Sequence, residues 1–329
     1  MSYVQILILA LIQGAAELLP ISSTAHVILV ARLMGYKDTS NPEFVFLLVM
    51  LHTGTMFAVL YYFWPRWRRW FSEEAKPQST QRTPREESNT SSVSSVTSVA
   101  TNSQRFTRFQ FFKMIALATA CTGVLGLGLL YLIEKVILIK MLGHEKGEVE
   151  DLFKSLPLMA AALISVGVFI IIAGIRRVKK NEPQSTKRAP REDSREIGPR
   201  VSILIGLVQG LCLPFRGFSR SGATISTALL CGVDRMLAED FSFALAVTLT
   251  PPVIIRELYR LLRDADWTGN TRLVDLLLPG LLGMGCSFVA GLAALHILSA
   301  ALEKGRWKYF GYYCLAFALV VILAAWMGY

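Results

Sequence analysis

Long apolar segments with almost no charged residue recur along the chain, separated by short polar turns and by two long polar stretches. Such a segment predicts a membrane-spanning helix when it contains about 20 residues. Four segments reach or approach that length: 44–64, 111–133, 156–175 and 276–298. Two shorter ones, 310–326 and 241–255, complete the set, and the second carries Pro251 and Pro252. The pattern therefore predicts an all-α polytopic membrane protein with about six transmembrane helices.

Two further apolar regions are each interrupted by a polar turn rich in Gly, Pro and Ser. The first pairs 4–12 with 25–34, and the second pairs 201–213 with 223–232. Both turns begin with Gln-Gly, pass through Leu-Pro and end in hydroxyl residues, as QGAAELLPISSTAH from Gln13 and QGLCLPFRGFSRSGAT from Gln209. Corresponding broken segments in two halves of a chain are typical of a midplane site built by a repeat. We expect two re-entrant helical hairpins related by an inverted-topology repeat.

The distribution of charge suggests an orientation. The net charge is +10, and basic residues cluster beside apolar segments, as at 66–69 and 176–180. The positive-inside rule accounts for this clustering, so we expect no nucleic-acid partner. With this orientation, we expect the polar stretches 72–103 and 181–195 to be disordered cytoplasmic linkers. The whole chain, 1–329, is then a single integral membrane domain. Four arginines within 256–272 argue against this orientation, because it places them outside.

The first interrupted turn carries groups suited to acid–base chemistry. Gln13 and Glu17 are four residues apart, so they share one face of a helix. A carboxylate, hydroxyls and an imidazole so close together form a plausible nucleophile and proton-transfer set. The hydroxyl and imidazole residues are Ser22, Ser23, Thr24 and His26. The alternative is that the hydroxyls cap a helix and that His26 is a packed polar residue.

The second interrupted turn is suited to binding phosphate. Arg220 offers a planar, permanently charged fork, which is costly in a membrane unless a function or a partner requires it. Glycines let backbone N–H groups approach an anion closely. The remaining candidates around Arg220 are Ser219, Ser221 and Thr224, with Gly217 and Gly222 as the glycines. The alternative is a structural ion pair, with Arg220 bound to Glu17.

Other polar residues in apolar surroundings are less informative. His52 interrupts a predicted span, where it could reach the site or bond a neighbouring helix. The charged run containing Asp234, Arg235, Glu239 and Asp240 is typical of an interfacial face. The five cysteines lack the spacing of metal ligands and imply no disulfide framework.

The two turns carry a recognisable pattern: the chain resembles the undecaprenyl-pyrophosphate phosphatase family, also called the bacitracin-resistance BacA family. That family has (E/Q)-x-x-x-E followed by Pro-x-Ser-Ser-Thr-x-His, matched here from Gln13 to Glu17 and by PISSTAH from Pro20. Its second motif is Pro-Gly-x-Ser-Arg-Ser-x-x-Thr. Here it reads RGFSRSGAT, with Arg216 in place of the motif's proline. The likeness covers most of the chain except the two polar linkers.

The resemblance implies a phosphatase of the bacterial inner membrane, with its site open to the outer side. Its substrate would be a polyprenyl pyrophosphate lipid, hydrolysed to the monophosphate and phosphate for cell-wall synthesis. The substrate-binding residues would be Gln13, Ser22, Thr24, Ser219, Ser221, Gly222 and Thr224, beside the catalytic Ser23, His26, Glu17 and Arg220. A divalent cation, Mg²⁺ or Ca²⁺, is expected, with Glu17 and Gln13 as its candidate ligands. The resemblance also allows a homo-oligomer.

Two questions stay open at this level. Either Ser23 or His26 could be the nucleophile, although Ser23 activated by His26 is the favoured arrangement. A transporter would also use an inverted repeat and a mid-membrane arginine. Ser23 beside His26 favours the enzyme, because a carrier needs neither a nucleophile nor a base. A structural scaffold would leave the hydroxyl clusters unexplained.

Overall fold

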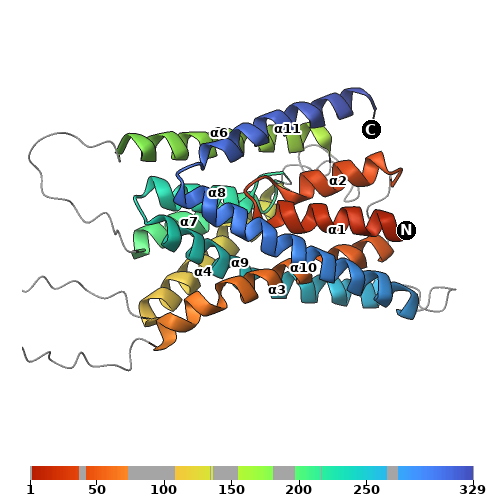
Figure 1. The fold of residues 1–329 in the computed structure, drawn as a ribbon, viewed down its shortest axis with the longest axis horizontal. Coiled ribbons are helices and arrows are strands. Elements are labelled where there is room, and N and C mark those ends of the chain that lie inside the picture. Colours follow the sequence, from red (N-terminus) through yellow and green to blue (C-terminus); the bar gives the residue numbers. More distant parts are fainter. Residues whose placement is uncertain are drawn as a thin grey trace, which may run out of the picture.

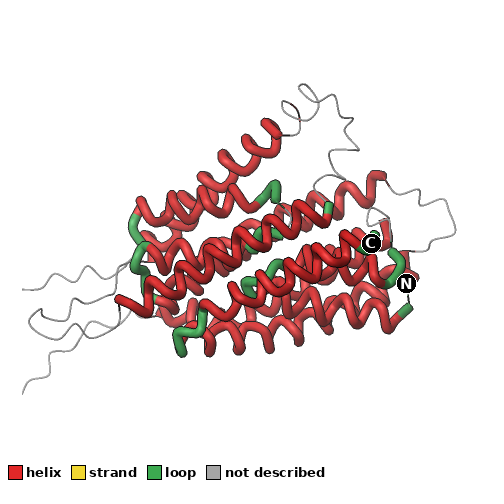
Figure 2. Tube along the Cα trace, turned by 90° about the horizontal axis from the view of Figure 1, so that it is seen from above, coloured by secondary structure: helices red, strands yellow, loops and turns green. Residues whose placement is uncertain are grey.

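The computed structural model describes residues 2–36, 42–72, 108–133, 135, 155–180, 197–215, 217–264 and 273–328. Within these ranges all the regular structure is helical, as predicted. The helices are α1 (Tyr3–Leu18), α2 (Ser23–Leu33), α3 (Pro42–Ser72), α4 (Arg108–Tyr131), α6 (Leu156–Lys180), α7 (Pro199–Cys212), α8 (Arg220–Leu230), α9 (Arg235–Asp264), α10 (Leu273–Glu303) and α11 (Lys308–Trp326). Most of them run roughly along the long axis of the molecule (Figures 1 and 2).

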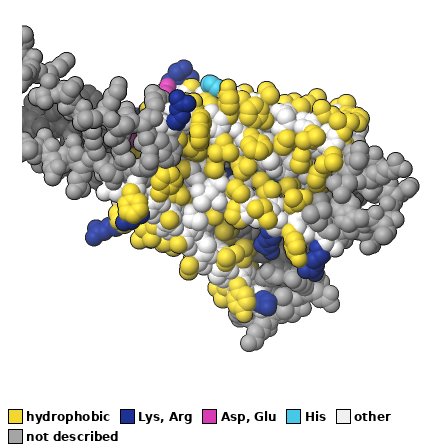
Figure 3. Space-filling model, turned by 90° about the horizontal axis from the view of Figure 1, so that it is seen from below, with side chains coloured by type: hydrophobic (Ala, Val, Ile, Leu, Met, Phe, Trp, Pro, Cys, Tyr) yellow, Lys and Arg dark blue, Asp and Glu magenta, His cyan; other side chains and the backbone are white. Residues whose placement is uncertain are grey.

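Six helices in the described part are long and apolar enough to cross a membrane: α3, α4, α6, α9, α10 and α11. They correspond one to one to the six predicted spans, so that prediction is confirmed. The predicted 241–255 span was too short, because α9 begins before it and continues beyond it, with Pro251 and Pro252 inside the helix as the prediction had them. Hydrophobic side chains cover much of the described surface, with basic side chains toward its margins (Figure 3). Such a surface suits a protein whose solvent is lipid.

The two interrupted regions form two helical hairpins, α1–α2 and α7–α8. In each, the chain turns between two helices that are too short to span a bilayer. The returning helices α2 and α8 have 11 residues each. That each hairpin is re-entrant in a bilayer stays a prediction.

The helix contacts follow the pattern of a two-fold repeat. Helix α1 packs on α10, and its counterpart α7 packs on α4, while α3 contacts α9 and α6 contacts α11. These contacts follow a rule if the first five helices correspond in order to the last five: α1, α2, α3, α4 and α6 to α7, α8, α9, α10 and α11. The α1–α10 contact then corresponds to the α7–α4 contact, and the α3–α9 and α6–α11 contacts each correspond to themselves. Helices α1 and α7 begin at opposite ends of the molecule (Figure 1). The repeat is thus inverted, and it brings the turns of the two hairpins together near the middle.

One expectation about charge is wrong. Glu239 and Asp240 are not on an interfacial face; both are buried in the bundle. Arg66 of α3 donates to both carboxylates, at 3.3 Å and 2.9 Å. Ser299 of α10 donates to Glu239 at 2.5 Å. Their burial is possible because these partners come from two other helices, which no local pattern in α9 reveals.

Some predictions fall outside the described residues. They concern the two predicted linkers, 72–103 and 181–195, of which only Ser72 is described. They also concern Arg216, which replaces the proline of the family motif.

Candidate active site

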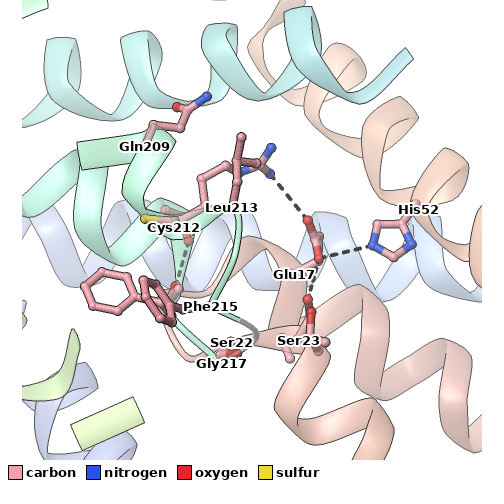
Figure 4. Close-up of a pocket in the computed structure, with 15 residues that line it drawn as sticks. Glu17, Ser22, Ser23, His52, Gln209, Cys212, Leu213, Phe215 and Gly217 are labelled. Atoms are coloured by element: carbon pink, nitrogen blue, oxygen red, sulfur yellow. Dashed lines mark hydrogen bonds and ion pairs between the residues drawn. The ribbon is translucent and has the colours of Figure 1, made fainter. Parts of the chain in front are cut away.

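Glu17 is the centre of a polar cluster built from four helices. Its carboxylate accepts a hydrogen bond from Ser23 Oγ of α2 at 2.5 Å and from Gln13 Nε2 of α1 at 3.1 Å. The guanidinium of Arg220, at the start of α8, lies 3.3 Å from the other carboxylate oxygen. His52 Nε2 of α3 lies 3.7 Å from Glu17 Oε2 (Figure 4). The two hairpins therefore meet through an ion pair, with a serine hydroxyl bound to the same carboxylate.

The predicted pairing of Gln13 with Glu17 is present, since the two side chains lie one helical turn apart and bond to each other. The structural alternative for Arg220 also exists, since it pairs with Glu17. The pair is accessible, however: the Glu17 and Arg220 side chains are 17% and 28% exposed. An accessible ion pair next to a serine hydroxyl can bind a ligand as well as hold two hairpins together.

The turn of the first hairpin leaves the start of α2 open. Ser22 precedes α2 with a φ of +68°, a left-handed conformation that non-glycine residues rarely adopt. Its side chain makes no capping hydrogen bond, unlike Ser219, which caps α8 by accepting from Gly222 N at 3.2 Å. The first N–H groups of α2 are thus left without a side-chain cap beside Ser23. Uncapped N–H groups at a helix start favour an anion.

The second hairpin supplies hydroxyls on both sides of Arg220. Ser219 and Ser221 lie within 3.4 Å of each other, and Ser221 Oγ donates to Leu19 O of the first turn at 3.4 Å. Gly217 has a φ of +104° and packs on Met159, where a side chain would collide with its backbone. The glycine therefore fixes the close approach of this turn to α6.

Two predicted substrate-binding residues of the second hairpin, Thr224 and Gly222, are taken up by contacts within the fold. Thr224 Oγ1 is 2.6 Å from Ser242 Oγ of α9 and donates to Arg220 O, so it braces α8. The N–H of Gly222 is taken up by the Ser219 cap, and its Cα packs against Pro20 and Ile170. Neither residue lines the cavity described below.

His26 also lies apart from the Glu17 cluster. Its Nδ1 donates to Ser22 O at 2.8 Å, and its Nε2 accepts from the Tyr313 hydroxyl at 2.9 Å. The ring stacks on Phe317 with centroids 3.6 Å apart. No hydrogen bond joins Ser23 and His26 in the described structure, and both imidazole nitrogens have other partners. His26 therefore supports the Ser22 turn. From the sequence, His26 was expected beside Ser23, but Glu17 occupies that position.

A cavity of about 200 Å³ opens between the two turns. It has room for several water-sized groups, since one water takes about 30 Å³. Predicted residues that line it are Glu17, Ser22, Ser23, Thr24, Gly217, Ser219, Arg220 and Ser221. Gln13 reaches it only through Glu17. A smaller cavity between α3 and α9 also has Glu17, His52 and Arg220 in its wall.

The cavity also includes residues that the sequence did not select. His52, which sequence left undecided, belongs to the wall, and so do Gln209, Cys212 and Phe215 (Figure 4). The Gln-Gly step that Gln209 shares with Gln13 was a usable signal, because corresponding positions of a repeat take corresponding places. His52 had no such signal, since its face of α3 depends on packing.

Comparisons with known proteins agree with this geometry. A sequence model described as "Bacitracin resistance protein BacA" matches residues 6–320. The chain is 47% identical over 328 residues to undecaprenyl-diphosphatase 2 of Acinetobacter baylyi, covering 99% of both chains. It is 30% identical to the undecaprenyl-diphosphatase of Desulfosudis oleivorans, over 100% of this chain and 99% of that one. The chain therefore belongs to the BacA family of bacitracin resistance proteins.

Proposed function

We propose that this protein is an integral membrane phosphatase that hydrolyses undecaprenyl diphosphate to undecaprenyl phosphate and inorganic phosphate. The observation that carries the proposal is Ser23 bound to Glu17, with Arg220 paired to the same carboxylate, at a polar cavity between two hairpins. The names of its relatives point to the same substrate. Recycling of this lipid carrier would serve cell-wall synthesis, which fits the resistance recorded in the family name.

The mechanism begins with Ser23. Its Oγ attacks the terminal phosphorus while its proton passes to the Glu17 carboxylate, 2.5 Å away. The bond from that phosphorus to the bridging oxygen breaks, and undecaprenyl phosphate leaves with the electron pair. Water then attacks the phosphoserine, which releases inorganic phosphate and returns a proton to Ser23. Ser23 is preferred to His26 as nucleophile because both nitrogens of His26 are already bonded.

Charge stabilisation comes from the second hairpin and from the start of α2. Arg220 binds oxygens of the diphosphate, with Ser219 and Ser221 as neutral donors in the same wall. Binding exchanges part of its bond with Glu17 for bonds with phosphate, which the accessible geometry of the pair permits. The uncapped N–H groups of α2 lie beside Ser23, where negative charge develops on the phosphoryl oxygens.

A divalent cation, Mg²⁺ or Ca²⁺, is part of the proposal. No group of three His, Cys, Asp or Glu side chains that could hold a metal occurs among the described residues. Such a cation would therefore arrive with the diphosphate, and Glu17 would be its ligand in the cavity wall. Gln13, the other candidate ligand, is 1% exposed and would act by supporting the Glu17 carboxylate to which it donates. Mg²⁺ commonly binds through one carboxylate and substrate phosphates. Such a cation would neutralise phosphate charge.

The location is proposed as the bacterial inner membrane, with the site open to the outer side. Helices α3 and α6 end, and α4 and α7 begin, at the same end of the molecule (Figure 1). Arg66, Arg68 and Arg176 lie toward that end of their helices, so the positive-inside rule makes it cytoplasmic. A homo-oligomer stays a prediction.

A lipid or anion transporter is the second candidate, favoured by the inverted repeat and by the two cavities that share Glu17, His52 and Arg220. Alternating access requires a site that can be reached from both sides in turn. The carboxylate-bound Ser23 weighs against it, because translocation requires no nucleophile.

The test is phosphate release from undecaprenyl diphosphate by the purified protein in detergent, with Mg²⁺, with Ca²⁺ and with a chelator. Ser23→Ala, Arg220→Ala and His26→Ala are assayed beside Ser165→Ala. Ser165 is a matched control, an exposed serine of α6 bonded only to its own helix. Release that collapses in Ser23→Ala and Arg220→Ala but persists in Ser165→Ala supports the proposal. Mass spectrometry of acid-quenched enzyme then locates the phosphoserine.

A wild type that binds the lipid without releasing phosphate would refute the enzyme. Reconstituted vesicles would then show whether the lipid changes leaflet, as the transporter requires.

A further inference from the structure

The turn between α1 and α2 has an unfavourable backbone conformation. Among the described residues, Ser22 is the one residue other than glycine with a positive φ, at +68°. Such a conformation persists only where surrounding contacts fix it. The side chain of Ser22 makes no capping hydrogen bond, so these contacts must act on the backbone of the turn.

The carbonyl of Ser22 is bonded by a side chain one helical turn later. His26 Nδ1 lies 2.8 Å from Ser22 O, whereas the backbone bond from His26 N to the same oxygen is 3.4 Å long. A distance of 3.4 Å is beyond the usual range of N–H···O bonds, so the imidazole is the stronger partner of this carbonyl. Because a carbonyl oxygen can only accept, Nδ1 must carry a proton.

Helix α11 holds the imidazole from its other side (Figure 1). In a neutral ring with its proton on Nδ1, Nε2 is an acceptor, and the Tyr313 hydroxyl donates to it at 2.9 Å. Phe317 stacks on the His26 ring with only 3° between the two planes. The adjacent Cys314 donates through Sγ to Pro20 O of the same turn at 3.4 Å. Two successive residues of α11 therefore support the turn, one through His26 and one directly.

This support reaches the cavity only through the turn. Ser22 and Ser23 line the cavity, but neither His26 nor Tyr313 does. Because Ser23 follows Ser22 directly, the conformation of Ser22 determines where α2 begins and where Ser23 Oγ lies relative to the Glu17 carboxylate. A contact that fixes Ser22 thus also fixes the proposed nucleophile.

We propose that Tyr313 is a positioning residue of the phosphatase site. Its hydroxyl holds the His26 ring in the orientation and tautomer that donate to Ser22 O. That bond keeps Ser22 in the conformation that places Ser23 against Glu17. The role rests on the proposed phosphatase activity. Tyr313 touches no reacting atom and acts through His26.

The test starts from Tyr313→Phe in the full-length protein, which removes the hydroxyl and keeps the ring. Tyr312→Phe is the matched control, because Tyr312 is the preceding residue of α11, is about half exposed and contacts Tyr309. The measured quantities are kcat and KM for undecaprenyl diphosphate and the thermal midpoint. For Tyr313→Phe we expect kcat to fall about 2- to 10-fold, the effect of one neutral hydrogen bond. KM and the midpoint stay near wild type, and Tyr312→Phe keeps wild-type kinetics.

A second variant tests whether Tyr313 acts through His26. The side-chain nitrogen of asparagine corresponds in position to Nδ1, so His26→Asn keeps a donor for Ser22 O but has no counterpart of Nε2. We expect His26→Asn to retain more activity than His26→Ala. Adding Tyr313→Phe to His26→Asn should cause no further loss of kcat, because the hydroxyl then has no imidazole to hold.

Nitrogen NMR gives a readout that does not depend on activity. The chain has four histidines, so imidazoles labelled with ¹⁵N give few signals, and His26→Asn identifies those of His26. Wild type should show a protonated Nδ1 and an unprotonated Nε2 that accepts a hydrogen bond. In Tyr313→Phe the Nε2 signal moves toward that of an unbonded nitrogen, while Tyr312→Phe gives the wild-type spectrum.

Several results would overturn the role. An unchanged His26 spectrum in Tyr313→Phe would remove the contact. An equal loss of kcat from Tyr313→Phe in wild type and in His26→Asn would separate Tyr313 from His26. A variant His26→Asn as inactive as His26→Ala would show that His26 acts through more than Ser22. If wild type releases no phosphate, the phosphatase proposal fails by itself. The NMR comparison then decides about Tyr313: a shifted Nε2 signal retains it as the support of the turn, and an unchanged one removes it.

Discussion

Replacing Glu17 by glutamine separates the two roles that the Glu17–Arg220 pair can have. The substitution keeps the size of the side chain but removes its charge. If Glu17 accepts the Ser23 proton, the enzyme loses its general base, which contributes about 10²- to 10⁴-fold to a rate. That corresponds to about 2.7–5.4 kcal/mol in the activation free energy. We expect kcat to fall by this factor in Glu17→Gln.

The effect on stability should be much smaller. Exposed ion pairs contribute about 0–1 kcal/mol, and breaking a fully buried pair costs about 3–5 kcal/mol. With side chains 17% and 28% exposed, this pair lies between those limits. A loss of about 1–2 kcal/mol in the free energy of unfolding lowers the midpoint by roughly 2–8 °C. The protein therefore stays folded at an assay temperature well below its midpoint.

The assay measures kcat at saturating undecaprenyl diphosphate and the thermal midpoint in the same detergent. Arg220→Met and the double variant complete a double-mutant cycle for both quantities. A variant Glu17→Gln with kcat within tenfold of wild type and a clearly lowered midpoint would refute the catalytic role. The pair would then be a structural clamp between the hairpins.

Two further predictions concern the scaffold. Gly217→Ala should cost about 1–3 kcal/mol of stability and most of the activity, because φ is +104° and the new Cβ would lie 2.8 Å from Met159 O. Gly123→Ala in α4, with open space around it, is the control, and thermal melts plus phosphate release compare the two. Arg66→Met should cost about 3–5 kcal/mol, because two buried carboxylates lose their cation. A midpoint equal to that of wild type would contradict the buried ion cluster.

The spanning helices and the hairpins could be predicted because their signals are local. A run of apolar residues needs no partner to identify it as a span, and a Gly/Pro/Ser turn identifies its own interruption. Proximity of Gln13 and Glu17 follows from helical spacing alone. The alternative for Arg220, an ion pair with Glu17, is present at 3.3 Å.

What the sequence could not give are the contacts that depend on which faces of distant helices meet. His26 was expected to bond Ser23, but its ring is bonded to Tyr313 and stacked on Phe317, nearly 300 residues later in the chain. The charged run with Glu239 and Asp240 was predicted to be an interfacial face, because its partner Arg66 is far away in the sequence. Charge or polarity by itself indicates a cost of burial, and only the fold shows whether a partner offsets it.

The inverted repeat places two different functional groups at corresponding positions of its two hairpins. Helices α2 and α8 begin at equivalent points, so Ser23 and Arg220 both occupy the first helical position after a serine. The two-fold relation brings these positions to opposite sides of one carboxylate. In the proposed mechanism, the nucleophile comes from one copy and the cation from the other, so neither hairpin could form the phosphoryl-transfer site alone. The two glutamines differ in the same way: Gln13 is bonded to Glu17, while Gln209 has Leu213 in the corresponding place and lacks that partner.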